Sequence, residues 1–262
     1  MKTNKIILII ATAVIFLGSC IKENRENCPS WLTIDLSKVD TAKVSNLSIF
    51  IINGDKEICK EIYLSKDLIK ESIEVELERK GYSIYSWGNI SKNTILNSQS
   101  QTLEIVPESC ADSLYFDKSY ILATAETNKT VVLPEKNYIN IKVFLEGIEK
   151  NDEYSIFFES ETSGYFINGE KILKNFRISA PYNEFSSANI IRQFDYNNLN
   201  LLIYNNEHNI KIPIGELIMK DPPAGFPEKL SDITLKIDFS HSILTIEIEG
   251  WKKIFENFCK IF

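Results

Sequence analysis

Residues 233–249 read ITLKIDFSHSILTIEIE, and this stretch decides the class of the fold. On both sides of residues 240–242, apolar side chains alternate with polar or charged ones. A period of two turns one face of a β-strand toward a core and the other toward water. The break at Ser240-His241-Ser242 predicts a reversal between two such strands. The stretch therefore predicts a β-hairpin with one buried face.

The same alternation recurs along the chain, for example in residues 73–78 and 139–146. Asn53-Gly54 and Asn168-Gly169 each separate two apolar runs. Asn-Gly favours a hairpin turn because both residues tolerate positive φ. Many short strands at a spacing of about ten residues are typical of a β-sandwich or a barrel. The sequence therefore predicts an all-β protein.

Helix-forming patterns are scarce. Residues 66–71 and 216–220 each predict a short helical turn, and Pro222-Pro223 ends the second. The strongest pattern is the last segment, where apolar residues fall at i, i+3, i+4 and i+7. We predict a short C-terminal helix there, docked on its own domain or offering a partner surface. The side chains of that surface are Trp251, Ile254, Phe255, Phe258 and Phe262.

A domain boundary is expected near Leu133-Pro134-Glu135, where one strand pattern ends and another begins. Residues 31–134 and 135–262 would then form two tandem β-sandwiches. Each has a length within the usual range of a domain.

The first twenty residues have the order of a lipoprotein signal. Met1–Lys5 carry two lysines and no acid, and Ile6–Leu17 are apolar or small. The end of this segment, Leu17-Gly18-Ser19-Cys20, resembles the lipobox of bacterial lipoproteins. The resemblance implies a signal peptide over residues 1–19, a lipid on Cys20 and a polar tether over residues 20–30. The alternative is a buried or disulfide-bonded Cys20.

Composition limits the function. With 44% hydrophobic and 25% charged residues, the chain has the balance of a globular protein. Its 36 acidic and 29 basic residues give a net charge of −7, which argues against a nucleic-acid partner. Only two histidines are present, His208 and His241, and both fall in predicted turns. No HExxH, GxSxG or phosphate-binding loop occurs. We therefore expect no enzyme, cofactor, metal or small-molecule substrate.

Four cysteines follow Cys20 at wide spacings, so the sequence has no CxxC site. Export permits disulfides, but four cysteines allow three pairings and buried thiols are an equal alternative. These cysteines are Cys28, Cys59, Cys110 and Cys259.

Two other functions stay open. The chain holds 11 tyrosines and 15 phenylalanines, which allow an aromatic platform that binds glycans on a β-sandwich. A hydrolase with a pair of carboxylates is the third hypothesis, although no pair stands out in the sequence.

An ordered series of motifs follows the lipobox. Cys28-Pro29 precedes a first strand over residues 31–36, and LSIFIING follows at 47–54. GYSIYSWGN at 81–89 and DSLYF at 112–116 come next. In this order and spacing the chain resembles the fimbrial anchor-lipoprotein family of Bacteroidia, whose fimbriae are called type V pili.

That resemblance implies two transthyretin-like Greek-key sandwiches on the outer membrane, lipid-anchored and exposed at the cell surface. It also implies a fimbrial shaft subunit as partner, held to the cell at the base of the fimbria. Shaft subunits of this class polymerise by strand exchange after cleavage at an arginine. The arginines here are Arg25, Arg79, Arg177 and Arg192. None lies between the first strand and Arg79, so we predict that the first strand is retained.

Overall fold

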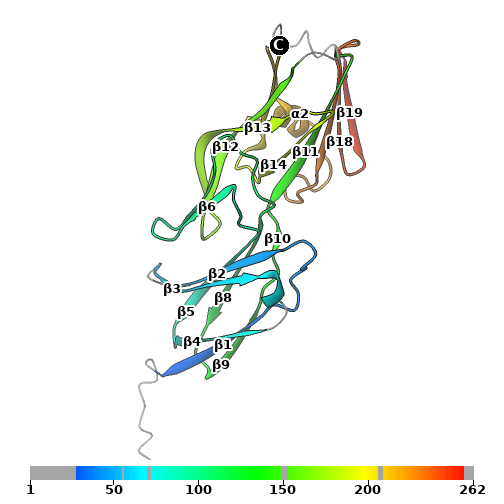
Figure 1. Cartoon of the computed structure of the whole chain (residues 1–262). Coiled ribbons are helices and arrows are strands. Elements are labelled where there is room, and N and C mark those ends of the chain that lie inside the picture. Colours follow the sequence, from blue (N-terminus) through cyan, green and yellow to red (C-terminus); the bar gives the residue numbers. More distant parts are fainter. Residues whose placement is uncertain (1–27, 55, 70–71, 149–152, 206–208, 257–262) are drawn as a thin grey trace, which may run out of the picture.

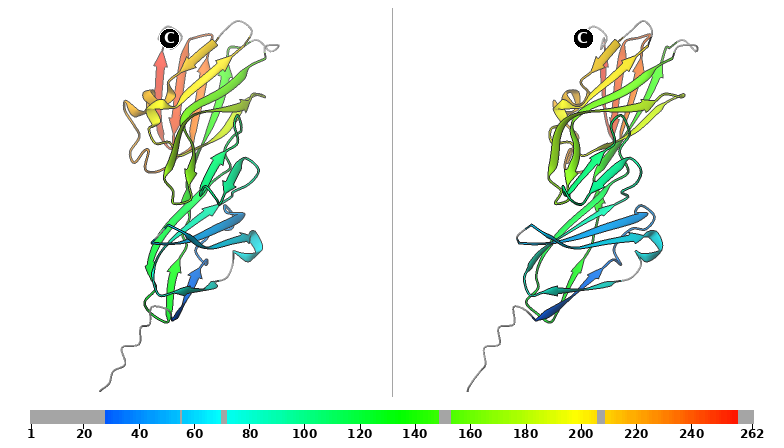
Figure 2. Two further views of the ribbon diagram at one scale, coloured as in Figure 1. Left: turned by 90° about the vertical axis from the view of Figure 1, so that its left-hand side faces the viewer. Right: turned by 60° about the vertical axis from the view of Figure 1, so that its left-hand side comes forward.

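The computed structural model describes residues 28–54, 56–69, 72–148, 153–205 and 209–256. Two β-sandwiches are stacked end to end, so that the molecule is elongated (Figures 1 and 2). Strand β1 (Pro29–Asp35) lies near one end and β19 (Trp251–Glu256) near the other (Figure 1). The predicted all-β class is confirmed.

The N-terminal sandwich contains a three-stranded and a five-stranded sheet. The smaller sheet has the order β4 (Ile73–Glu78), β1, β9 (Thr127–Val131). The larger sheet has the order β10 (Glu135–Lys136), β8 (Tyr115–Leu122), β5 (Gly81–Gly88), β2 (Asn46–Asn53), β3 (Ile58–Ser65). Strand β1 is antiparallel to β4 and parallel to β9, which comes about ninety residues later.

The C-terminal sandwich is built in the same way. One sheet has the order β14 (Ser186–Ile191), β11 (Tyr138–Glu146), β17 (Ile233–Asp238), β18 (Ile243–Ile248), β19. The other has the order β16 (Asn209–Ile212), β15 (Asn200–Tyr204), β12 (Ser155–Phe166), β7 (Thr102–Ile105), β6 (Thr94–Asn97). Strand β13 (Lys171–Pro181) pairs with β12 along its other side.

In the described part of the chain, helical structure is limited to short pieces. They are the 3-10 turns η2 (Lys66–Leu68) and η3 (Tyr196–Asn198) and the helix α2 (Ile214–Met219). The turn η2 and the helix α2 lie where the sequence predicts short helical turns. No helix in the described ranges is long and apolar enough to span a membrane.

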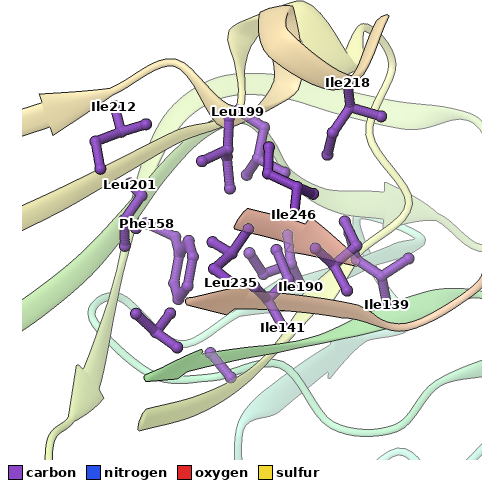
Figure 3. Packing of buried hydrophobic residues seen from close by; sticks show 14 of the residues in the cluster. Ile139, Ile141, Phe158, Ile190, Leu199, Leu201, Ile212, Ile218, Leu235 and Ile246 are labelled. Carbon is purple, nitrogen blue, oxygen red and sulfur yellow. The ribbon is translucent and has the colours of Figure 1, made fainter. Parts of the chain in front are cut away.

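The alternation of apolar and polar side chains along the strands produces the core of the C-terminal sandwich (Figure 3). Ile141, Leu235 and Ile246 from one sheet meet Phe158 from the other, and all four side chains are fully buried. Burying a side chain of this size stabilises the fold by about 1.5–3 kcal/mol. The hairpin at residues 233–249 is confirmed, with β17 and β18 paired from Ile233↔Ile248 to Asp238↔Ile243.

A third buried cluster lies at the junction of the two sandwiches. Strand β2 contributes to it with Phe50 and Ile52, while Leu47, Ile49 and Ile51 face the N-terminal core. Both faces of β2 are therefore covered, which explains why residues 47–52 are nearly all apolar instead of alternating.

The junction also joins distant parts of the chain in one sheet. Strand β7 pairs with β12 from Gly164↔Glu104 to Phe166↔Thr102. Residues 94–105, which precede the predicted boundary, thus extend a sheet of the C-terminal sandwich. The boundary at residues 133–135 follows β9 and includes the first residue of β10, and it stays a prediction.

The predicted C-terminal helix is wrong where the structure describes it, because residues 251–256 form strand β19. Trp251 pairs with Ile248 and Phe255 with Leu244, after a turn at Glu249-Gly250 with positive φ. Positions 251 and 255 share a face in a strand, with a period of two, as well as in a helix, with a period of 3.6. The segment forms a strand because the open edge of β18 offers it a ladder of hydrogen bonds. Phe258, Cys259 and Phe262 lie outside the described residues.

Candidate interaction surfaces

Strand β1 lies near the end of the molecule that the N-terminal sandwich forms. Its Leu32 and Ile34 are fully buried, and its backbone is paired on both sides, with β4 and with β9. At its start, the Ser30 hydroxyl donates to the Ala125 carbonyl at 2.9 Å and accepts from the Asn128 amide at 2.7 Å. Strand β1 is therefore an integral central strand. Cys20 and the rest of residues 1–27 lie outside the described residues.

An ion pair on the solvent face supports the same sheet. Lys129 of β9 lies 2.8 Å from Asp35 of β1. This lysine and the hydrogen bonds from Ser37 hold the pKa of Asp35 well below its usual range.

The opposite end of the molecule carries β19, the outermost strand of its sheet. Trp251 and Phe255 pack against the C-terminal core, while Ile254 on the other face is 56% exposed. The predicted apolar stripe is therefore split between two faces. Lys253 pairs with Asp221, and Lys252 lies 3.3 Å from Glu247. An outermost strand leaves one row of backbone groups available to another strand.

Cys28, Cys59 and Cys110 are free thiols. Cys110 donates to the Ser179 carbonyl at 3.4 Å, and burial raises the pKa of its thiol. Cys59 is exposed on β3. Cys259 lies outside the described residues.

Potential metal-binding side chains are dispersed over the part of the chain that the structure describes. His241 stands in the turn between β17 and β18, with its Nδ1 2.7 Å from Asp238, and the ring is 72% exposed. Its hydrogen bond lowers the pKa of Asp238. Among the described residues, no three His, Cys, Asp or Glu side chains gather as metal ligands would. His208 is outside the described ranges.

The junction holds a pocket of about 460 Å³ that is lined by charged side chains of both signs. Asp117, Lys118 and Glu135 come from β8 and β10, whereas Lys171 and Arg192 come from β13 and the end of β14. Burial and the charge of Glu135 raise the pKa of Asp117, although its hydrogen bonds oppose this. Burial and Arg192 lower the pKa of Lys171. Burial in this pocket thus disfavours the charged forms of one carboxyl group, Asp117, and one amino group, Lys171.

A second pocket, of about 320 Å³, lies on the solvent face of the sheet that holds β12. Glu159 of β12 stands between Arg177 of β13 and Asn200 of β15 in the register of the strands. All three side chains point away from the core, because the neighbouring Phe158 points into it.

Solved structures share this arrangement of sandwiches, although no protein-family model and no curated protein matches the sequence. The fimbrial anchor protein Mfa2 from Porphyromonas gingivalis superposes with a TM-score of 0.64 at 12% identity, over 86% of this chain and 99% of that one. This chain has the fold of a fimbrial anchor protein. The resemblance found in the sequence is confirmed at the level of the fold.

Two further structures from related bacteria have the same fold. A candidate polysaccharide-binding protein from Bacteroides thetaiotaomicron matches with a TM-score of 0.66 at 10% identity, over 87% of this chain and 98% of that one. A fimbrial assembly protein from Parabacteroides distasonis matches with a TM-score of 0.50 at 10% identity, over 87% and 98%. At these identities the likeness concerns the fold alone.

Within this anchor-like fold, neither pocket was predicted from the sequence. Their residues come from strands that are distant along the chain, and no local spacing marks them. The one available signal was the outward position of charged residues in alternating strands, which also describes any solvated strand face.

Proposed function

We propose that this protein is a non-enzymatic surface lipoprotein that holds a fimbria to the outer membrane through a lipid on Cys20. The observation that carries the proposal is the fold, which is shared with a fimbrial anchor protein over 86% of this chain and 99% of that one. The lipobox at residues 17–20 and the ordered motifs after it support the same function.

The state of β1 fits an anchor better than a shaft subunit. Strand exchange in a shaft subunit requires loss of the first strand after cleavage. Here Arg25 precedes β1, and Arg79 follows β4. Cleavage at Arg79 would remove β1 to β4 together and most of the N-terminal core. We therefore propose that β1 is retained, and the N-terminus of the mature protein on cells tests this.

The two ends of the molecule suggest a division of tasks. A lipid on Cys20 would hold the β1 end near the membrane, and β19 near the other end would face a shaft subunit (Figure 1). We propose that the shaft subunit binds there through strand and interface contacts. No described strand pairs with the outer edge of β19, and the row of backbone groups along that edge supports this arrangement.

The test compares cells that lack the protein with cells that carry Cys20→Ala. Deletion should release fimbriae into the medium or lengthen them. The Cys20→Ala chain should leave the outer-membrane fraction and reproduce the deletion. A Cys59→Ala chain is the matched control, because its exposed thiol has no assigned role. Fimbriae that stay attached with normal length in both test strains would refute the proposal.

A further inference from the structure

The pocket on the solvent face of the β12 sheet has features that the proposed anchoring function does not use. It has a volume of about 320 Å³, at the lower end of the range of ligand sites. Strands β12, β13 and β16 and the turn η3 all contribute polar side chains to it. The main ones are Glu159, Glu161, Asn175, Arg177, Asn198 and Lys211.

The charges of this lining cancel. Glu159 and Glu161 oppose Arg177 and Lys211, and Lys211 lies 3.0 Å from Glu159. An anion would meet the two carboxylates, and a cation would meet the guanidinium and the ammonium group. The balance therefore favours a ligand without net charge.

Several polar groups in the pocket have no partner among the residues that the structure describes. The carboxylate of Glu161 and the side-chain amides of Asn175 and Asn198 make no hydrogen bond or ion pair with any described residue. The pocket thus offers carboxylate acceptors beside amide groups that both donate and accept. A sugar hydroxyl also donates and accepts, so neighbouring hydroxyls match this mixture.

The position of Arg177 is fixed by aromatic rings. Its guanidinium lies 3.9 Å from the ring centre of Phe157 and 5.3 Å from that of Tyr204. The two rings meet edge to face, with centroids 5.7 Å apart. A donor held in this way loses little conformational freedom when a ligand binds. The aromatic residues thus position a polar donor, whereas the sequence suggested that they would form the sugar platform themselves.

From these four features we infer that the pocket formed by β12, β13, β15, β16 and η3 binds a neutral saccharide. The site is separate from β1 and β19, so it neither requires nor replaces the anchoring function. The ligand class is defined by cancelled charge, unpartnered donors and acceptors, and a preorganised arginine.

The test uses the full chain, purified in a detergent without a sugar head group. Saturation-transfer NMR is recorded with the methyl glycosides of mannose, glucose and galactose. N-acetylneuraminic acid and glucosamine serve as anionic and cationic comparators. At least one neutral glycoside should receive saturation, and the charged sugars should bind at least about tenfold more weakly.

Two variants locate the site. Glu161→Gln and Asn175→Ala should each weaken binding of that glycoside about tenfold, since the first replaces a charged acceptor by a weaker neutral one and the second removes a hydrogen bond. Glu146→Gln is the matched control, because Glu146 is an exposed carboxylate on β11 in the opposite sheet. Unchanged melting temperatures show that all three variants fold.

Three results would overturn the inference. They are the absence of saturation transfer to every neutral glycoside, equal or tighter binding of a charged sugar, and binding that both pocket variants leave unchanged. Each result is independent of whether the chain anchors fimbriae.

Discussion

Trp87 shows how one residue can join two sandwiches. Its side chain is fully buried, and its Nε1 donates to the Ile167 carbonyl at 2.9 Å. The ring also lies against Phe116 and Tyr165, with centroids 4.4 and 5.0 Å away. Trp87 belongs to β5 and Ile167 to the β12–β13 turn, so the bond connects the two halves of the chain.

We predict that Trp87→Phe lowers the free energy of unfolding by about 2–4 kcal/mol. The loss combines an unpaired buried carbonyl at Ile167 with a partly empty site. Urea unfolding followed by circular dichroism measures it. Trp31→Phe is the control, since Trp31 is 42% exposed and should change stability by less than about 0.5 kcal/mol. Equal effects of the two substitutions would contradict this role of Trp87.

The pKa of Asp117 leads to a second prediction. Because this pKa is raised, the folded state binds the proton more tightly than the unfolded state does. Asp117 therefore destabilises the protein above its folded-state pKa and ceases to do so as the pH falls below the unfolded value. Asp117→Asn should raise the melting temperature at pH 7.5 by about 1–3 °C, with no gain at pH 3.5.

Asp35→Asn provides the opposite case. The pKa of Asp35 is lowered by Lys129 and Ser37, so its stabilising effect is present above the unfolded pKa and is lost in acid. The Asp35→Asn chain should melt earlier than the wild type at pH 7.5, and the difference should shrink toward pH 2. Scanning calorimetry across this range checks both signs. If Asp117→Asn and Asp35→Asn changed the melting temperature in the same direction at pH 7.5, the opposite effects assigned to the two carboxyl groups would be refuted.

At the scale of elements, β19 illustrates the limits of periodicity. Residues 251–262 have the spacing of an amphipathic helix, yet the described part is a strand. The two arrangements agree on the inward position of Trp251 and Phe255 and differ on Ile254, which the strand places outside.

We predict that Phe255→Ala lowers the free energy of unfolding by about 1–3 kcal/mol and Ile254→Ala by less than about 0.5 kcal/mol. A half-buried ring loses contacts with the core, whereas an exposed side chain does not. Denaturant unfolding measures both. Similar losses at the two positions would favour a helix in which both side chains are buried.

Ile254 also tests the proposed partner contact at β19. Ile254→Lys adds a charge beside the free edge and should reduce attachment of fimbriae without changing the melting temperature. Thr234→Lys is the control, because it adds the same charge to the same face on β17, two strands away from the edge. The measurement is the amount of fimbria retained per cell. Equal retention in the two strains would argue against β19 as the contact.

Near Gly164, strand β12 changes its neighbour in the sheet from β15 to β7. The register of β12 against β13 shifts beside it, and a Cβ at this position would overlap the Leu103 carbonyl. Gly164→Ala should therefore separate β7 from β12 and lower the free energy of unfolding by about 1–3 kcal/mol. Faster amide exchange in residues 102–105 would confirm it. Gly54→Ala, where a Cβ meets nothing within 4 Å, should leave exchange unchanged.

At the scale of the whole molecule, the junction joins the two sandwiches through a shared sheet and a shared buried cluster. The β6–β7 hairpin leaves the N-terminal half and completes a sheet of the C-terminal half. Leu103, Tyr165 and Ile167 are buried together with Trp87 as a result. Buried side chains of each predicted domain are thus covered in part by residues of the other domain.

We predict that the intact chain unfolds in one cooperative transition, and that a fragment of residues 135–262 is less stable than the same residues in the chain. Without β7, the fragment exposes Tyr165 and Ile167 to water. Calorimetry and binding of a hydrophobic dye measure the difference. A fragment that melts at the temperature of the intact chain and binds no dye would refute the prediction.

The sequence by itself determined the all-β class, the hairpin at residues 233–249 and the positions of the turn η2 and the helix α2, but not that of the turn η3. These features follow from local periodicity, from proline and from turn-forming residues, which act between near neighbours. Ordered motifs behind the lipobox also indicated the fold that the solved structures share.

Tertiary structure alone decided the state of residues 251–256, the double burial of β2 and the sheet to which β6 and β7 belong. It also assembled the saccharide pocket, where Glu161 and Asn198 stand together although 37 positions separate them in the sequence. Each of these depends on a partner that is distant along the chain. The free energy of pairing with an open sheet edge or covering an apolar face outweighs the local preference of a few residues.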